Sequence, residues 1–177
     1  EIDAVLHFPL YKELDRVLSD GAPTSQLRYR LETFVDGDLF RDPFVTPLFV
    51  DNHDVERFIG SGTVAGLQQA LLVIMTLPGI PVVYYGTAQT FRDSRPAMFA
   101  AGWGSGGEDH YDGETALYGY IAGLAAARAA ALLADVLQDA EVDDLGGGHP
   151  VLFVDQDVGG LEVTVDDAAF DAAMARQ

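Results

Sequence analysis

The sequence predicts an α/β fold with a parallel sheet, followed by a small β-rich segment. Apolar segments of strand length alternate about three times with segments of helical spacing, which favours a parallel sheet, either open and doubly wound or closed as a barrel. From about residue 134 the chain is Asp-rich and offers two alternating strands instead. We therefore expect two domains, residues 1–131 and 132–177. With 177 residues, 49% of them hydrophobic, the chain can bury a substantial core.

The first strand and the first helices are predicted near the N-terminus. Residues 3 to 10 form an apolar run that we expect to be a buried strand, and His7 within it is interpreted as a core histidine. The following helix is closed by Gly21, and its apolar stripe consists of Leu10, Leu14, Val17 and Leu18. A second helical stripe lies in "SQLRYRLETFVDGD", at Leu27, Leu31 and Phe34.

Two further strands flank a buried helix. Residues 46 to 51 are predicted to be the second strand. "GIPVVYYG", residues 79 to 86, is the third, nearly continuous in apolar residues as a parallel strand covered on both faces should be. Between them, Ser61 or Thr63 is expected to cap a helix that runs to Leu77. The buried stripe of this helix consists of Val64, Leu67, Leu71 and Ile74 or Met75.

The remaining elements are a helix and a hairpin. Residues 114 to 131 are predicted to be helical from the spacing of Leu117, Tyr120, Ile121, Leu124 and Arg128. "VLFVDQD" and "LEVTVDD" alternate as strands do, and Gly159-Gly160 between them indicates a hairpin.

The charge balance limits the partners of the chain. It has 28 acidic and 10 basic residues, a net charge of −18, and Lys12 as its only lysine. This surface repels nucleic acid, and its composition is typical of a protein adapted to high salt. No cysteine is present, so disulfides are excluded. The longest apolar run, "ALLVIMTLPGIPVVYY", is broken by Pro78, Gly79 and Pro81, so we expect neither a membrane span nor a membrane partner.

A polar stretch at the end of the second strand is the best candidate for a functional site. Residues 51 to 54, Asp-Asn-His-Asp, follow an apolar segment directly, and four polar residues there are poorly explained as core. In parallel α/β sheets, ligands meet the C-terminal ends of the strands, which here are residues 52–54 and 84–86. The sequence therefore predicts chemistry at this edge of the sheet.

Three motifs carry a resemblance to a known family. "FVDNHDVERF", "LPGIPVVYYGTAQ" and "DSRPAMF", in this order, resemble the alpha-amylase superfamily, glycoside hydrolase family 13. "AVLHFPLY" is similar to the sixth strand of the family's (β/α)8 barrel. The resemblance implies that residues 1–131 are the C-terminal third of the barrel, strands six to eight, and that residues 132–177 begin the β-rich domain that follows it. The chain opens at Glu1 without an initiator methionine or leader, so we expect it to be cut from a longer protein, whose compartment is not predicted.

The resemblance also implies a reaction. Family members cleave α-glucosidic bonds in starch or maltooligosaccharides by a retaining mechanism, with a nucleophile and a general acid on strands that this chain does not contain. Asp54 matches the family's third carboxylate, which holds hydroxyls of the sugar in the cleavage subsite. His53 matches a histidine that donates to the same sugar, and Asn52 is expected to support the turn. Asp93 and Arg95 match a pair that reaches the neighbouring sugar.

Each site residue has a simpler alternative. Asp54 and His53 are also compatible with a strand-end cap that accepts backbone N–H groups. Asp93 and Arg95 are equally compatible with a surface ion pair. His53 and Glu56 together are a poor metal site, and no metal ligand is assigned. No cofactor is expected in this segment, although the resemblance implies that a structural calcium is possible in the full-length protein.

Side chains around the candidate site have alternatives as well. Arg57 is expected to pair with a nearby carboxylate. Tyr84 and Tyr85 are interpreted as packing residues. Trp103 in the Gly-rich loop 102–114 is compatible with stacking on a sugar or with a hydrophobic plug.

Two features leave the function open. The family usually has a glutamate where this chain has Ala88, in "YYGTAQ", which weakens the expectation of ordinary activity. Glycosyl transfer to another sugar is an alternative to hydrolysis, and a non-catalytic amylase-like binding module, or an unrelated α/β binding protein, is an alternative to an enzyme. We expect the chain alone to be inactive and poorly folded, because part of a barrel leaves unpaired sheet edges.

Overall fold

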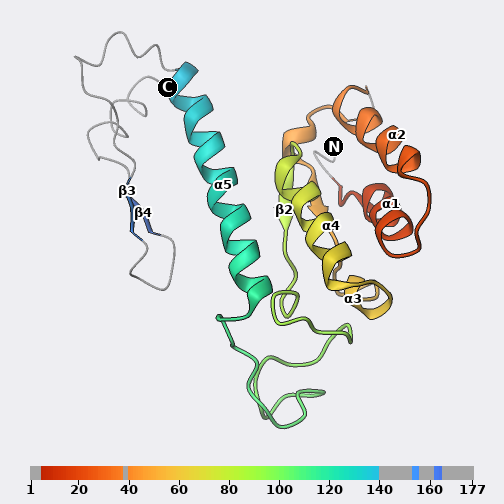
Figure 1. Ribbon diagram of the computed structural model, residues 1–177, viewed down its shortest axis with the longest axis vertical. Coiled ribbons are helices and arrows are strands. Elements are labelled where there is room, and N and C mark those ends of the chain that lie inside the picture. The colour runs from red at the N-terminus through yellow and green to blue at the C-terminus, as the bar shows by residue number, and fades with distance from the viewer. Residues whose placement is uncertain (1–4, 38–39, 140–152, 156–161, 165–177) are drawn as a thin grey trace. The chain divides into compact units, whose positions relative to one another are not determined.

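The computed structural model describes residues 5–37, 40–139, 153–155 and 162–164 (Figure 1). The chain divides into two compact units, Glu1–Leu124 and Ala125–Gln177, and the division falls within a long helix. The assignment of two domains with a boundary near residue 132 stays a prediction.

Two helices open the first unit. Helix α1 spans Phe8–Leu18 and buries Leu10, Leu14 and Val17. Helix α2 spans Thr24–Val35 and buries Phe34. Both helices and their apolar stripes are confirmed, because side chains at steps of three and four share one face of a helix. Gly21 adopts φ +74° after α1 ends.

The predicted strand over residues 3 to 10 is wrong in its described part. Residues 5–7 form no strand, and α1 already begins at Phe8. His7 caps this helix, since its Nδ1 accepts a hydrogen bond from Leu10 N at 3.3 Å. Pro9 fits the first helical turn, where its missing N–H is not needed, and it cannot donate to a strand ladder. A backbone bond from His7 N to Pro47 O, 3.0 Å long, still ties the segment to the first strand.

A parallel strand pair lies at the centre of the first unit. Strands β1 (Pro47–Phe49) and β2 (Ile80–Val82) pair in parallel, with Leu48 opposite Pro81. The connection runs through α3 (Phe58–Ser61) and α4 (Val64–Thr76), and a 3₁₀ turn (Pro43–Val45) precedes β1. Thr63 caps α4 by accepting a bond from Gly66 N at 3.0 Å. The predicted parallel arrangement and the helix between the strands are confirmed.

The expectation that β2 is covered on both faces is wrong for the described residues. Ile80 and Val82 are 50% and 38% exposed. Within the part of the chain that the structure describes, β1 is the strand hydrogen-bonded to β2, so the other edge of β2 has no described partner. In larger sheets, the open edge of such an apolar strand is paired with a further strand or covered by another chain segment.

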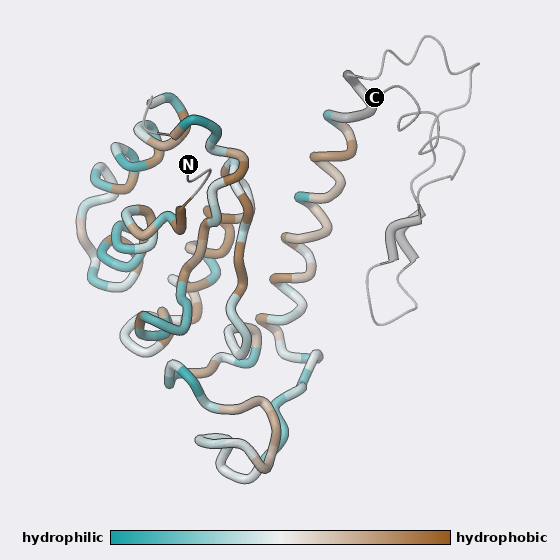
Figure 2. The backbone as a smooth tube through the Cα atoms, turned by 180° about the vertical axis from the view of Figure 1, so that it is seen from behind, coloured by the Kyte–Doolittle hydropathy of each residue, from teal (hydrophilic) through white to brown (hydrophobic). Residues whose placement is uncertain are grey.

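The core of the first unit is built by the strands and the helices around them. The strands appear as mainly brown, hydrophobic segments in Figure 2. The cluster of buried residues comprises Leu10, Leu14, Phe34, Leu48, Val50, Phe58, Ile59, Leu67, Ala70, Leu71, Ile74, Met75 and Leu117. Val64, expected in the buried stripe of α4, is 45% exposed, because it is the first residue of the helix.

Helix α5 spans Ala116–Asp139 and is longer than predicted. Its first part packs on the core of the first unit through Leu117, and Tyr120 Oη donates to Gln68 O at 3.0 Å. By length and composition, Ala116–Asp135 is apolar enough to cross a membrane, so the expectation that the chain holds no such run was wrong. Only 6% of this window is buried in the structure, and the absence of a membrane partner stays a prediction.

The second unit contains the predicted strand pair. Strands β3 (Phe153–Asp155) and β4 (Glu162–Thr164) are antiparallel, with Val154 opposite Val163. The two strands of the hairpin are therefore confirmed. Gly159-Gly160, expected to form its turn, lies outside the described residues.

Candidate active site

The polar stretch after β1 lies beside the segment that follows β2. The rings of His53 and Tyr84 are 6.5 Å apart between centroids. Each residue follows a strand, and the two strands are parallel, so both lie at the C-terminal edge of the pair. The structure thus brings together the two strand ends, residues 52–54 and 84–86, at which the sequence predicts a functional site.

The four residues of the polar stretch separate into a buried half and an exposed half. Asp51 and Asn52 are 1% and 9% exposed. The side chains of His53 and Asp54 are 63% and 58% exposed. The expectation that all four are poorly explained as core is therefore wrong for Asp51, which is an interior charge with interior partners.

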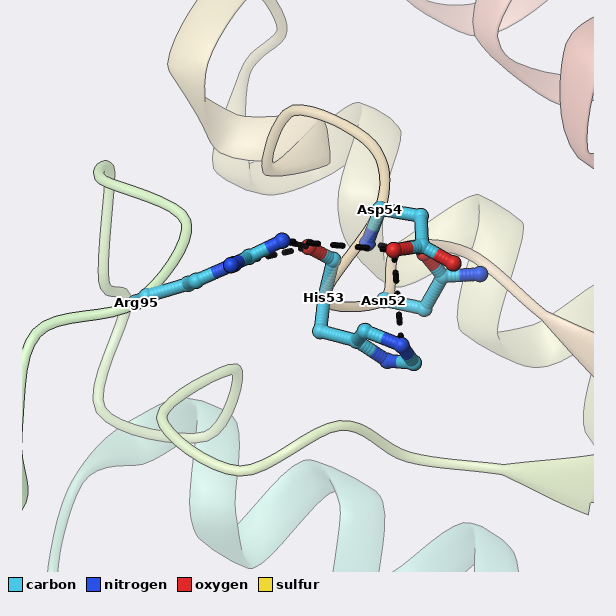
Figure 3. Close-up of polar contacts among 4 residues, drawn as sticks. All are labelled: Asn52, His53, Asp54 and Arg95. Atoms are coloured by element: carbon cyan, nitrogen blue, oxygen red, sulfur yellow. Dashed lines mark hydrogen bonds and ion pairs between the residues drawn. The ribbon is translucent and has the colours of Figure 1, made fainter.

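Asn52 closes the turn that presents Asp54. Its Oδ1 accepts a hydrogen bond from Asp54 N at 2.8 Å (Figure 3). This is the Asx turn by which an asparagine side chain mimics a backbone turn. In the described part of the chain no backbone N–H donates to the Asp54 carboxylate. Asn52, and not Asp54, therefore accepts the backbone N–H bond that was the alternative role for Asp54. The Asp54 carboxylate stays open to solvent.

Arg95 connects the loop after β2 to this turn. Its Nε and Nη2 both donate to His53 O, at 3.0 and 2.7 Å, and its Nη2 lies 3.9 Å from Asp54 Oδ1 (Figure 3). His53 Nε2 lies 3.4 Å from the same carboxylate oxygen. Exposed ion pairs of this length stabilise a fold little. Their effect is to place a carboxylate, an imidazole and a guanidinium within reach of one ligand.

Asp93 is placed differently from Arg95. The two side chains do not pair, so the surface ion pair that competed with a binding role for them is not formed. Asp93 instead contributes its backbone O, which accepts a bond from Arg57 Nε at 3.2 Å. Asp93 is an exposed residue, and a role of either residue in substrate binding stays a prediction.

Arg57 forms the buried centre of the region. Its Nη1 lies 3.7 Å from Asp51 Oδ1, and both side chains are at most 1% exposed. Thr87 joins the pair, since it accepts from Arg57 Nη1 at 3.2 Å and donates to Asp51 Oδ1 at 2.9 Å. The guanidinium carbon lies 4.1 Å from the Tyr84 ring centroid and 5.2 Å from that of Tyr85. The prediction that Arg57 pairs with a carboxylate is confirmed.

The electrostatics of this pair follow from its burial. Burial raises the pKa of the Asp51 carboxyl, and Arg57 and the Thr87 hydroxyl oppose that rise. Burial likewise lowers the pKa of Arg57, and Asp51 opposes the change. Burial thus disfavours the charged form of each group, and the opposite charge beside it offsets this cost, so the pair holds together the segments that carry it.

Sequence reasoning missed part of this arrangement. Thr87 was not singled out, since a lone threonine after a strand has no distinguishing pattern. Tyr84 and Tyr85 were expected to pack, and they do so against the Arg57 guanidinium. Trp103 is 78% exposed, so its interpretation as a hydrophobic plug is wrong. Within the described ranges no group of three or more His, Asp or Glu side chains is placed to hold a metal ion.

The chain is similar in sequence and in fold to known proteins. No protein-family model matches the chain. The chain is 33% identical over 137 residues to an alpha-amylase of Saccharomycopsis fibuligera, which covers 76% of this chain and 26% of that protein. It is 31% identical over 88 residues to a cyclomaltodextrin glucanotransferase of Thermoanaerobacterium thermosulfurigenes, which covers 49% of this chain and 12% of that protein. The structure of an alpha-amylase from Malbranchea cinnamomea superposes with a TM-score of 0.63 at 25% identity, over 77% of this chain and 28% of that chain.

The chain is an α/β protein, and its structural neighbours are (β/α)8 barrel proteins of the alpha-amylase type. The amylases and glucanotransferases that the chain resembles in sequence and fold are members of the alpha-amylase superfamily, glycoside hydrolase family 13, and the matches are consistent with a segment of a protein of this family. The matched part spans between 12% and 28% of the length of the three proteins described above. The resemblance stated from the three sequence motifs is confirmed.

Proposed function

We propose that this chain is the C-terminal part of the barrel of an amylase-type enzyme that acts on α-glucosidic bonds in starch or maltooligosaccharides by a retaining mechanism. The observation that carries the proposal is the exposed Asp54 carboxylate, held by the Asn52 turn at the C-terminal end of β1 and flanked by His53 and Arg95. Relatives named amylases and glucanotransferases support the substrate class.

Asp54 would act on the charge of the reacting sugar. A glycosidic transition state resembles an oxocarbenium ion, whereas the bound sugar is neutral. A carboxylate that holds ring hydroxyls beside it favours the positive state over the neutral one, so it contributes to turnover more than to binding. His53 and Arg95 supply donors at the same place, and Asp93 lies on the loop next to them.

The nucleophile and the general acid would come from strands outside this sequence. The open edge of β2 supports this proposal, since Ile80 and Val82 are exposed apolar residues on a strand with no described partner at that edge. We therefore expect the 177-residue chain by itself to release no reducing sugar from starch above the buffer background.

Glycosyl transfer is the second candidate reaction within the family. One relative is named a cyclomaltodextrin glucanotransferase, and Asp54 would hold a sugar in the same way whether water or another sugar accepts it. A non-catalytic binding module is the candidate from another class, supported by Ala88 where the family usually has a glutamate.

The experiment is an assay of the longer protein that carries this chain on maltoheptaose. Chromatography of the products distinguishes shorter oligosaccharides, which indicate hydrolysis, from cyclic or longer ones, which indicate transfer. A protein that binds maltoheptaose but yields neither kind of product would support the binding module and contradict the enzyme.

A further inference from the structure

The hydroxyl of Thr87 joins the two strand ends of the candidate site at their buried side. Its Oγ1 donates to Asp51 Oδ1 at 2.9 Å and accepts from Arg57 Nη1 at 3.2 Å. Thr87 is 2% exposed, so water does not compete for either bond. A hydroxyl can donate and accept at once, which allows it to serve a carboxylate and a guanidinium together. One side chain thus connects the turn after β1 to the segment after β2.

The backbone around Thr87 holds this hydroxyl in place. Thr87 N donates to Tyr84 O at 3.2 Å, and Thr90 N donates to Thr87 O at 3.0 Å, so Thr87 takes part in two successive turns. A further bond from Phe91 N to Gly86 O, 3.0 Å long, closes the same loop. The hydroxyl is therefore carried by a loop whose backbone is bonded on both sides of it.

The segment that carries Asp54 is closed on itself. The Asp51 carboxylate accepts a hydrogen bond from the Phe58 backbone, and it lies 3.7 Å from Arg57 Nη1. The side chain at the start of the segment therefore binds two residues at its end, and Asp54 lies between them. These bonds fix the shape of the segment, whereas its place relative to the loop after β2 depends on bonds that cross between the two.

Among the bonds that cross between the two segments, those of Thr87 are buried. Arg57 Nε also crosses, to Asp93 O, but this bond is only partly buried. The two bonds from Arg95 to His53 O are exposed, so water competes with them. Both partners of Thr87 are charged, and a hydrogen bond to a charged group is about twice as strong as one between neutral groups. Loss of the Thr87 hydroxyl should therefore loosen the contact between the two segments.

We propose that Thr87 is a positioning residue that holds the Asp54 turn in place against the loop after β2. The proposal rests on the proposed function, since it concerns the reaction at Asp54. Thr87 is buried and acts on a sugar only through Asp54. Misplacing a reacting group by about 1 Å can cost about 100-fold in rate. Because the segment around Asp54 stays closed by Asp51, removal of the hydroxyl should cost less, about tenfold in kcat.

Kinetics of the proposed full-length enzyme on maltoheptaose test this role. Thr87→Val removes the hydroxyl at nearly constant volume, and we expect kcat to fall about tenfold while KM stays within a few fold of the parent. Thr87→Ser keeps the hydroxyl and should keep kcat. In an enzyme that already carries Asp54→Asn, Thr87→Val should lower kcat no further, because the group that it positions is gone. Thr87→Ala takes the place of Thr87→Val if the latter does not fold.

Thr115→Val is the matched control. Thr115 Oγ1 donates to Ala88 O at 2.7 Å and accepts from Tyr118 N at 3.0 Å. It thus bonds to the residue next to Thr87 but, within the described residues, to neither charge of the buried pair. Urea unfolding of both variants measures how much stability each loses. We expect Thr115→Val to keep a near-parental kcat even where its loss of stability matches that of Thr87→Val.

The outcomes separate this role from the proposed function. Where Asp54→Asn itself reduces kcat, three results overturn the positioning role alone: a parental kcat for Thr87→Val, an equal fall for Thr115→Val, or a further fall when Thr87→Val is added to Asp54→Asn. A full-length protein that does not cleave maltoheptaose, or whose kcat is indifferent to Asp54→Asn, overturns both.

Discussion

Asp51 and Arg57 form an interior ion pair, with Oδ1 and Nη1 3.7 Å apart, and the exposed Asp54 lies between them in the sequence. The pair joins the turn after β1 to the segment after β2, because Thr87 bonds to both charges. The exposed Asp54 carboxylate is thus carried by a segment whose two ends, Asp51 and Arg57, are anchored in the interior.

Removing one charge of this pair should destabilise the protein strongly. Arg57→Gln leaves the buried Asp51 carboxyl without its ion-pair partner, and we expect a loss of about 3–5 kcal/mol in the free energy of unfolding. Urea unfolding followed by circular dichroism measures it. Asp51→Asn combined with Arg57→Gln removes both charges and should lose less than the sum of the single variants. Additive losses would contradict the coupling described here.

The stability of the protein should depend on pH through His7. Burial, with a smaller contribution from Arg30, lowers the pKa of His7 from its ordinary 6.5 to about 4. The unfolded chain therefore binds more protons than the folded one between these values, so stability falls as the pH drops from 6.5 towards 4. The full effect is on the order of 3 kcal/mol.

His7→Asn isolates this contribution among the many acidic groups. Asparagine is a good helix cap but does not titrate, so the variant should keep the cap of α1. We expect the difference in unfolding free energy between pH 7.5 and pH 5 to be smaller in the variant than in the parent. Parallel pH dependence of the two proteins would contradict a neutral buried His7.

Two glycines allow strain and steric clash to be separated. Gly86, at the end of the segment that follows β2, has φ +76°, and a Cβ there would run into the Phe91 ring. Gly106 has φ +70°, but nothing lies near its missing Cβ. Alanine at Gly106 should cost about 1–2 kcal/mol from backbone strain alone, and alanine at Gly86 should cost more. Thermal unfolding of both variants checks this order, and equal losses would contradict the close packing of Phe91.

Local patterns in the sequence predicted the helices and the polar strand end well. The stripes of α1, α2 and α4 and the Thr63 cap depend on neighbouring residues, which periodicity reports directly. The strand expected at residues 3 to 10 failed because His7 and Pro9 begin a helix, and a capping histidine is a weak signal. The exposure of β2 and the interior partners of Asp51 depend on which segments meet in space. The pattern of residues along the sequence does not say which distant segments come together.

The most direct test of the proposed function is the kinetic effect of Asp54→Asn in the proposed full-length enzyme. Glu56→Gln, which removes another exposed carboxylate of the same segment, is the matched control. We predict a fall in kcat on maltoheptaose of about 10²–10³-fold for Asp54→Asn with a much smaller change in KM, and near-parental values for Glu56→Gln. A kcat that stays within a few fold of the parent for Asp54→Asn, or an equal fall for Glu56→Gln, would contradict the assignment of Asp54.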